Sequence, residues 1–213
     1  MIVYEPKQIE NIYPFIDFEP GWFILGGPAD ACEAQEMRKK YPNICIIGFE
    51  PHPELYNVQL ARGFPGRLLP VALWEDSREL ILRTVVDQPK GPWQDRRASS
   101  VNKFTSSVGR EVCRVKATTL DTLSSEYGPF EDAILWIDIE EAELYALRGA
   151  AGLMATRQIR LINAEVDDQH LRPIAELLAQ FGIREVHRWN ANTRIIQNKP
   201  RYDWWNIIYK LKE

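Results

Sequence analysis

The sequence predicts an α/β fold with a mostly parallel central sheet, an antiparallel C-terminal edge and helices on both faces. Two observations support this prediction. Buried-strand patterns alternate with helical patterns along most of the chain, as they do in parallel βαβ units. The last strand-like runs follow one another with short connections, which favours antiparallel pairing at the edge of the sheet.

The composition fits a folded protein with a large core, because 45% of the 213 residues are hydrophobic and 26% are charged. The length favours one domain over residues 1–213. A formal net charge of −4 argues against nucleic acid and acidic macromolecules as partners. We see neither a signal peptide nor a bilayer-spanning run, and therefore expect a cytoplasmic protein without a membrane partner. Three scattered cysteines favour neither a zinc site nor a disulfide framework.

The first half of the chain is predicted to begin β-α-β-α after an N-terminal extension, residues 1–20, that holds a short helix. Apolar and β-branched runs that stop at glycine or at an acid predict strands, and apolar residues at helical spacing predict helices. A hairpin should follow, with a polar turn between its two strands. The expected elements are a helix at about 6–15, a strand at 21–27, a helix at 29–41, a strand at 43–51, a helix at 53–63, and hairpin strands at 66–74 and 78–85.

A long loop is predicted over residues 87–107, where prolines, serines and clustered charges show no period. It is either a solvated surface loop or a lid, in which case Trp93, Arg96, Arg97 and Lys103 would grip an anionic group of a substrate. Strand and helix patterns then alternate again. The expected elements are a strand at 110–119, a helix at 120–128, a strand at 132–138, a helix at about 141–150, a strand at 159–166, a helix at 171–182, and strands at 184–189, 193–197 and 204–211.

Two glycines end the first predicted strand, in the run ILGGPAD. Gly26 and Gly27 carry no Cβ, so a ligand can approach the backbone there, and the helix that follows can receive an anionic group at its N-terminus. The alternative is a tight turn that needs glycine only for its backbone angles. The pattern alone leaves both readings open.

The second predicted strand ends in an acid, Glu50, 23 positions after Gly27. A carboxylate at this place commonly accepts hydrogen bonds from ribose hydroxyls in nucleotide-binding α/β folds. A solvent-facing glutamate is the alternative for Glu50 taken alone. Together, the glycine turn and this acid favour binding of a nucleoside.

Four acids fall within six positions at the end of the strand over 132–138. Glu141 and Glu143 are explained by the helix dipole, which stabilises exposed acids in the first turn of a helix. The dipole does not explain Asp138, which still belongs to the strand end, or Glu140, which the turn should aim toward the cleft. We therefore regard Asp138 and Glu140 as candidate functional residues.

Several runs, in this order, resemble the FkbM family of S-adenosylmethionine-dependent methyltransferases. They are FEP at 49–51, AL at 72–73, TLD at 119–121, DIEEAE at 138–143 and LRGA at 147–150. The likeness extends from about residue 22 to residue 185. It implies a Rossmann-like class I methyltransferase fold, S-adenosylmethionine as the cofactor, and O-methylation of a hydroxyl on a sugar or another small metabolite.

The resemblance also implies roles for residues near the first two strands. Gly26 and Gly27 would lie against the methionine part of the cofactor. Glu50 would bind the ribose hydroxyls, and Pro51 and His52 would flank the adenosine.

Further along the chain, the resemblance implies an adenine-binding segment and a reaction centre, with Asp138 at both the cofactor and the reacting groups. The matching residues are Ala72, Leu73 and Trp74 near the adenine, Asp138 and Glu140 at the reaction centre, and Glu165 after the fifth strand.

The sequence departs from the family pattern at three positions. The family's first motif reads D-x-G-A-x-x-G; with its G-A on residues 27–28, Leu25 replaces the aspartate and Ala31 replaces the last glycine. Glu141 replaces the glycine of the D-x-E-G run. The aspartate normally orients the cofactor's amino group, so its loss bears on affinity.

Methyl transfer requires a nucleophilic oxygen aligned with the methyl group, and a base that takes its proton. Asp138 or Glu140 is the first choice of base, because both belong to the matched motif. His170, and also His52, are the histidine alternatives. The run EVDDQH raises one further question, because Asp167, Asp168 and His170 are either a metal site or a loop with a helix cap. We expect the cap and no metal.

The leading hypothesis is therefore an O-methyltransferase whose substrate is a small hydroxylated metabolite or sugar, with a homodimer as a candidate assembly. The alternative is a catalytically inactive relative that binds a nucleoside-like ligand or a protein partner through the same cleft. An NAD-linked oxidoreductase fits the glycine turn and Glu50, but it leaves the T-L-D and D-x-E runs unexplained.

Overall fold

The computed structural model describes residues 9–28, 31–85, 99–101, 109–193 and 203–212. Its elements are, in chain order, the 3-10 helix η1 (Ile9–Phe15), β1 (Trp22–Gly26), α1 (Cys32–Lys40), β2 (Cys45–Phe49), α2 (Pro53–Ala61), β3 (Arg67–Leu69), β4 (Ala72–Leu73), β5 (Arg78–Val85), β6 (Ser99–Ser100), β7 (Gly109–Thr118), α4 (Leu120–Tyr127), β8 (Ala133–Ile137), α5 (Glu143–Arg148), α6 (Ala151–Ala155), β9 (Ile159–Asp167), α7 (Leu171–Ala179), β10 (Ile183–Thr193) and β11 (Asp203–Leu211).

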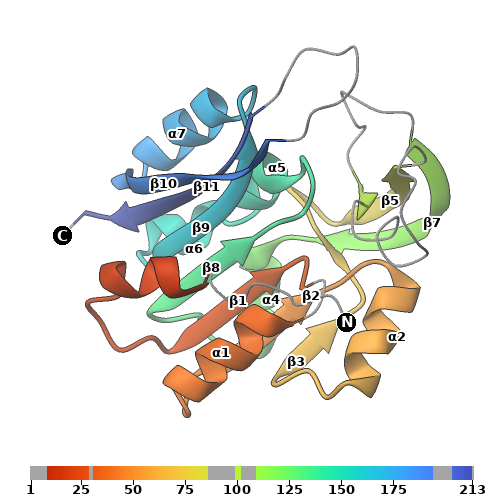
Figure 1. Ribbon diagram of the computed structural model, residues 1–213, viewed down its shortest axis with the longest axis horizontal. Helices are drawn as coiled ribbons and strands as arrows, with labels where there is room; N and C mark the ends of the chain where they lie inside the picture. Colours follow the sequence, from red (N-terminus) through yellow and green to blue (C-terminus); the bar gives the residue numbers. More distant parts are fainter. Residues whose placement is uncertain (1–8, 29–30, 86–98, 102–108, 194–202, 213) are drawn as a thin grey trace.

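The central sheet has seven strands in the order β10-β11-β9-β8-β1-β2-β3 (Figure 1). Strands β3, β2, β1, β8 and β9 are parallel, and β11 lies antiparallel between β9 and β10. The predicted fold class is confirmed, including the antiparallel C-terminal edge. The strand order reverses at β1, which has β2 on one side and β8 on the other, so the crevice expected to bind ligands lies at the carboxyl ends of these three strands.

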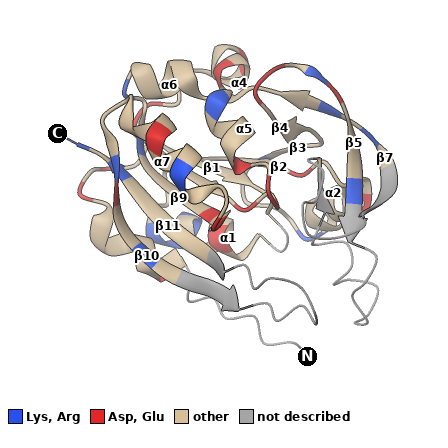
Figure 2. Ribbon diagram, turned by 90° about the horizontal axis from the view of Figure 1, so that it is seen from above, with Lys and Arg blue, Asp and Glu red and all other residues tan. Residues whose placement is uncertain are grey.

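Helices cover both faces of the central sheet. Figure 2 shows α4, α5, α6 and α7 on one side and α1 on the other. The first side packs Leu123, Leu147 and Ile174 into the larger hydrophobic cluster. On the opposite side, η1 and α1 contribute residues such as Ile12 and Met37 to a separate cluster. Burial on both faces explains why the parallel strands consist of nearly continuous apolar runs.

A second sheet, of order β4-β7-β5-β6, lies beside the central one, and it corrects the predicted hairpin. The run 66–74 does not form one strand. It divides at Pro70, which has no N–H to donate to a ladder: β3 joins the central sheet and β4 pairs in parallel with β7. Strand β5 pairs with β7 instead of β4. Within the predicted loop 87–107, Ser99 and Ser100 form β6; the structure otherwise describes only Val101 of that segment, and the four proposed substrate-gripping residues lie outside the described residues.

The helix predicted at about 141–150 is also corrected. Helix α5 begins only at Glu143 and ends at Arg148, and α6 follows as a separate helix. Glu140 and Glu141 precede it with left-handed backbone angles, φ 54° and 73°, which a right-handed helix cannot contain. Glu141 and Glu143 are not exposed acids of a first turn, since their exposed fractions are 3% and 2%.

The T-L-D run has a structural role at the start of α4. The Thr119 hydroxyl accepts a hydrogen bond from the N–H of Thr122 at 2.9 Å and so caps α4. The Asp121 carboxylate accepts bonds from the N–H groups of Gly152 and Leu153, at 2.8 and 2.9 Å, and thereby caps α6. This short motif therefore ties together two helices that cover the sheet.

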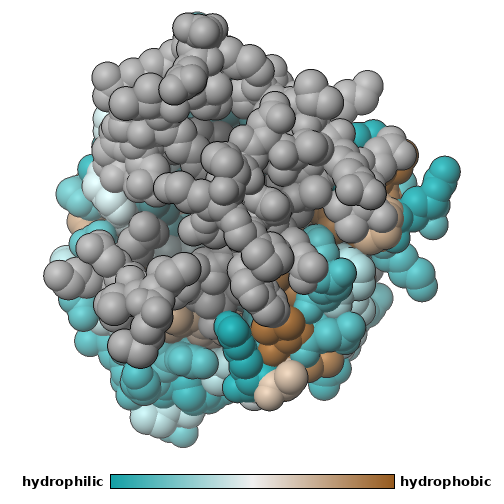
Figure 3. All heavy atoms as spheres, turned by 45° about the vertical axis from the view of Figure 1, so that its right-hand side comes forward, coloured by the Kyte–Doolittle hydropathy of each residue, from teal (hydrophilic) through white to brown (hydrophobic). Residues whose placement is uncertain are grey.

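The remaining predicted elements agree with the structure where it describes them, except that the N-terminal helix is a 3-10 helix over Ile9–Phe15 and the strand predicted at 193–197 lies outside the described residues beyond Thr193. The described surface visible in Figure 3 is mostly hydrophilic, with hydrophobic residues in a few small areas. In the described part of the chain, no helix is long and apolar enough to cross a membrane.

Candidate active site

A pocket opens at the carboxyl edge of the central sheet and holds about 560 Å³ of empty space, part of it open to solvent. Its walls are mostly apolar and carry three carboxylates, a composition typical of small-molecule sites. The second sheet and α2 close it from the side. The lining residues are Gly27, Phe49, Glu50, Pro51, Leu55, Ala72, Leu73, Leu82, Val101, Asp138, Ile139, Glu140 and Ala142.

Most of the predicted site residues come together in this pocket, although they belong to four separate segments of the chain. They are Gly27, Glu50, Pro51, Ala72, Leu73, Asp138 and Glu140. The parallel register explains part of this meeting, because Gly26 of β1 is paired with Phe49 of β2 and Ile137 of β8. The residue that follows each of these strands therefore emerges at the same point of the edge.

Gly26, His52 and Trp74 were predicted beside the cofactor, but they do not line the pocket. A Cβ on Gly26 would lie 3.2 Å from side-chain atoms of Ile137 in β8 and of Ile139 in the loop after β8, so a glycine here allows these side chains to pack closely against β1. His52 caps α2 by accepting a bond from the N–H of Glu54 at 3.3 Å. The ring of Trp74 stacks on Tyr145 with 4.0 Å between centroids, and neither residue lines the pocket.

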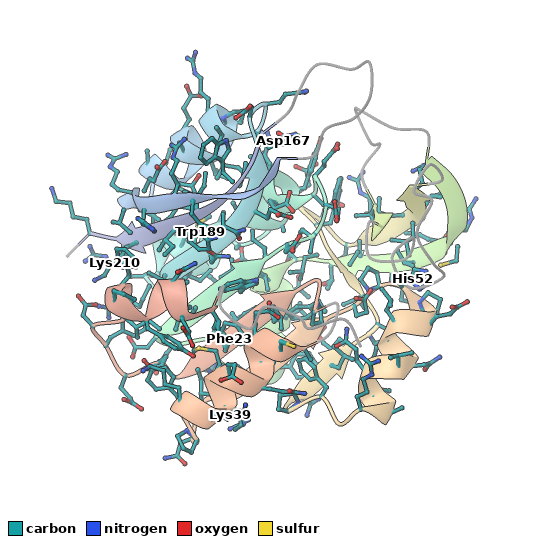
Figure 4. All side chains as sticks on the ribbon, in the orientation of Figure 1. Phe23, Lys39, His52, Asp167, Trp189 and Lys210 are labelled. Carbon is teal, nitrogen blue, oxygen red and sulfur yellow. The ribbon has the colours of Figure 1, made fainter. Side chains whose placement is uncertain are left out.

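His170, the histidine candidate for the base, is also outside the lining. Its Nδ1 lies 2.8 Å from Oδ1 of Asp167, and this hydrogen bond raises the pKa of His170. Figure 4 places Asp167 at the carboxyl end of β9, well separated from His52 at the start of α2. Asp168 accepts a bond from the indole N–H of Trp205 at 2.9 Å. Among the described residues, no group of three or more His, Cys, Asp or Glu side chains could hold a metal ion. Glu165, in β9, also does not line the pocket.

Glu50 is a buried carboxyl group at the pocket wall, with only 5% of its surface exposed. In the described part of the chain, its hydrogen-bond donor is the N–H of His52, at 2.9 Å from Oε1. Burial raises the pKa of Glu50 to about 7, and the bond from His52 opposes this rise. A carboxyl group with spare acceptor capacity in an apolar pocket suits a ligand that brings hydroxyl donors.

The loop between β8 and α5 carries the other two acids. The N–H of Asp138 donates to the carbonyl oxygen of Gly26 at 3.2 Å, which fixes the start of the loop against β1. Gly27 is part of the same contact, because a Cβ built on it would lie 2.0 Å from the carbonyl oxygen of Asp138. Only glycine therefore permits this approach of the two backbones, and the approach brings Asp138 and Glu140 to the pocket wall.

Sequence reasoning missed the apolar walls and one acid. The walls come from Phe49, Leu55, Leu82, Val101, Ile139 and Ala142. Nothing in a single sequence separates such residues from the core. Glu143 is buried and accepts a hydrogen bond from the N–H of Ile139 at 2.8 Å. The signal that could have found it is its place one residue after Ala142 and one before Leu144, a carboxyl group flanked by apolar side chains.

A scan against protein-family models matches residues 28–188 to the methyltransferase FkbM domain. The match spans more than half of the chain. The chain belongs to the FkbM methyltransferase family. This finding confirms the family resemblance drawn from the short motifs, and it places the chain among S-adenosylmethionine-dependent methyltransferases. A search of curated proteins finds no significant match.

Solved structures similar to this FkbM domain are also methyltransferases. A precorrin-6y C5,15-methyltransferase from Geobacter metallireducens GS-15 has 14% sequence identity and a TM-score of 0.50, with 96% of this chain and 86% of that chain covered. A TehB-like SAM-dependent methyltransferase from Corynebacterium glutamicum has 9% identity and a TM-score of 0.47, with 96% and 87% covered. At these identities, the first likeness supports the class I methyltransferase fold and nothing finer.

The three departures from the FkbM pattern now have locations. Leu25 is 1% exposed and packs in the cluster under α1, so an apolar side chain fills the place of the aspartate. Ala31 and Glu141, which replace glycines, keep left-handed backbone angles, φ 61° and 73°. The chain has thus retained the backbone that glycine favours while adding a side chain at each position.

Proposed function

We propose that this FkbM domain is an S-adenosylmethionine-dependent O-methyltransferase that acts on a hydroxyl of a sugar or another small metabolite. The observation that carries the proposal is the meeting of Gly27, Glu50, Asp138 and Glu140 in one apolar pocket at the point where the strand order reverses. The family and the fold supply the class of reaction, and these residues supply the site.

The residues present fit the cofactor. Gly27 lies in the pocket wall without a side chain of its own, and the Glu50 carboxyl has acceptor capacity for two ribose hydroxyls. Phe49, Leu55 and Leu73 offer apolar surface for the adenine. When bound, S-adenosylmethionine supplies an electrophilic methyl group on a positively charged sulfonium, a charge that the acids of the pocket stabilise.

Asp138 and Glu140 are the candidate bases, because both residues line the pocket. Both also follow β8, the neighbour of β1, where the strand order reverses. The base accepts the proton of the acceptor hydroxyl as its oxygen attacks. The apolar walls keep water from part of the pocket and help to hold the acceptor beside the base. His52 and His170 lie outside the lining, so we do not assign the proton to them.

The proposal is tested by incubating the protein with S-adenosylmethionine and a panel of sugars, polyols and small alcohols, and measuring S-adenosylhomocysteine by mass spectrometry. We expect turnover with at least one class of acceptor. Of the variants Asp138→Asn and Glu140→Gln, the one that removes the base should lower kcat about 100-fold or more. If S-adenosylhomocysteine binds in a Glu50-dependent way but no acceptor is methylated, the proposed catalytic activity is contradicted and a non-catalytic binding domain is favoured.

A further inference from the structure

Glu143 is the first residue of α5, and its carboxyl group is buried in the protein interior. It directly follows residues 138–142, the loop between β8 and α5 that carries Asp138 and Glu140 and is called the acidic loop below. Its exposed fraction is 2%, and it does not line the pocket. Burial raises the pKa of Glu143 well above its ordinary value, and the nearby carboxyl groups of Asp138 and Glu140 add to the rise. Burying an acid beside two others costs stability, and hydrogen bonds to the carboxyl group offset part of this cost.

The Glu143 side chain supplies a hydrogen-bond acceptor for a backbone N–H of the loop. Its Oε1 accepts a hydrogen bond from the N–H of Ile139, four residues earlier, at 2.8 Å. The preceding N–H, that of Asp138, already donates to Gly26 in β1. The first two amides of the loop are therefore fixed, one by the sheet and one by the helix that follows.

The next two residues of the loop need such support. Glu140 and Glu141 both have left-handed backbone angles, φ 54° and 73°. This conformation is unfavourable for any residue other than glycine. Strained backbone of this kind persists only where the surroundings hold it in place.

The strained turn decides what faces the pocket. Asp138, Ile139, Glu140 and Ala142 all line it, whereas Glu143 stays behind. Glu143 therefore does not touch a ligand in the pocket, and it acts on the pocket through the backbone that it holds and through its electrostatic interaction with Asp138 and Glu140.

We propose that Glu143 is a positioning residue, which holds the N–H of Ile139 and so fixes the turn that presents Asp138 and Glu140 to the pocket. The role of these two acids rests on the proposed function, whereas the hold on the loop does not. Since only an acceptor oxygen is needed, glutamine at this position should serve as well as glutamate, and leucine, which has a similar volume and no acceptor, should not.

The test compares wild type, Glu143→Gln and Glu143→Leu by amide hydrogen exchange and by titration with S-adenosylhomocysteine. In Glu143→Leu, we expect faster exchange of the amides at 138–142, unchanged exchange in β9 and α7, and affinity about 10-fold weaker or more. Glu143→Gln should restore both properties to within about threefold of wild type. A general loss of stability in Glu143→Leu would instead speed amide exchange throughout the domain, in β9 and α7 as well as at 138–142.

Three results would overturn the proposal. The first is wild-type exchange and affinity in Glu143→Leu. The second is a glutamine variant that is as impaired as the leucine variant, because then the charge and not the acceptor is needed. The third requires no variant, and applies if Glu143→Leu does not fold: an Ile139 amide in wild type that exchanges as fast as an unprotected one. If wild type binds no S-adenosylhomocysteine, the proposed function fails, but the exchange measurements still decide the hold on the loop.

Discussion

Replacing Gly27 with alanine is expected to destabilise the protein by about 3 kcal/mol and to weaken S-adenosylhomocysteine binding about 100-fold or more. The residue has φ +75°, and an added Cβ would lie 2.0 Å from the carbonyl oxygen of Asp138. That atom belongs to the backbone, so the contact can be relieved only if the acidic loop moves away from β1. Chemical denaturation and calorimetric titration measure the two losses.

Gly63 provides a matched control. It has the same φ, +75°, but an added Cβ would meet no atom within 4 Å. Gly63→Ala should therefore show only the backbone penalty, about 1 kcal/mol, with wild-type affinity. If Gly27→Ala bound the ligand as well as Gly63→Ala does, close approach of the loop to this glycine would not be what forms the pocket.

Replacing Glu50 with glutamine is expected to change stability and binding in opposite directions. Burial raises the pKa of Glu50 to about 7 in the folded protein, from 4.5 in its absence. The folded state therefore holds the proton more tightly than the unfolded chain. Stability falls as the pH rises from about 4.5 to about 7, and is then constant, with a total loss of about 3 kcal/mol.

Glu50→Gln should remove this loss, because its side chain carries no charge at any pH. We expect the variant to unfold at higher denaturant concentration than wild type at pH 8, and to match wild type near pH 4.5. At pH 8, where Glu50 of the wild type is mostly charged, the affinity of the variant for S-adenosylhomocysteine should be about 10- to 100-fold weaker, since hydrogen bonds to a charged acceptor are lost; near pH 4.5 the difference should shrink. Denaturation and titration at both pH values check this.

Glu54→Gln is a suitable control, because this acid lies four residues further on and is exposed. Its effect should stay within about 0.5 kcal/mol at either pH. A Glu50→Gln variant with wild-type affinity would remove Glu50 from the ligand site, and one with the same stability as wild type at pH 8 would mean that the carboxyl group is not buried as described.

The residues that sequence reasoning found are those that break a local pattern. Glu50 and Asp138 each end an apolar run, and parallel pairing with β1 then brings the two strand ends together. That is why the carboxyl edge of the sheet and the acids on it were predictable from short motifs. The hairpin over 66–85 was wrong because Pro70 divides one apolar run between two sheets, and an apolar run does not show to which sheet each part pairs.

Other features depend on contacts between distant segments. Leu55 and Leu82 line the pocket, but in the sequence they are indistinguishable from core residues. Glu143 resembled an ordinary acid at a helix start, because its burial comes from the packing of the whole domain. His170 has a chemically suitable side chain, yet Asp167 holds it at the carboxyl end of β9, outside the pocket lining.

Titration of the wild-type protein with S-adenosylhomocysteine tests the central claim, that this pocket is a cofactor site. The account predicts one site per chain with a dissociation constant in the micromolar range, about 8 kcal/mol of binding free energy. At pH 6, where the pKa of about 7 leaves Glu50 mostly protonated, binding should also release protons to the buffer. Absence of heat and of any thermal shift at millimolar ligand would contradict it, and the fold would then serve another purpose.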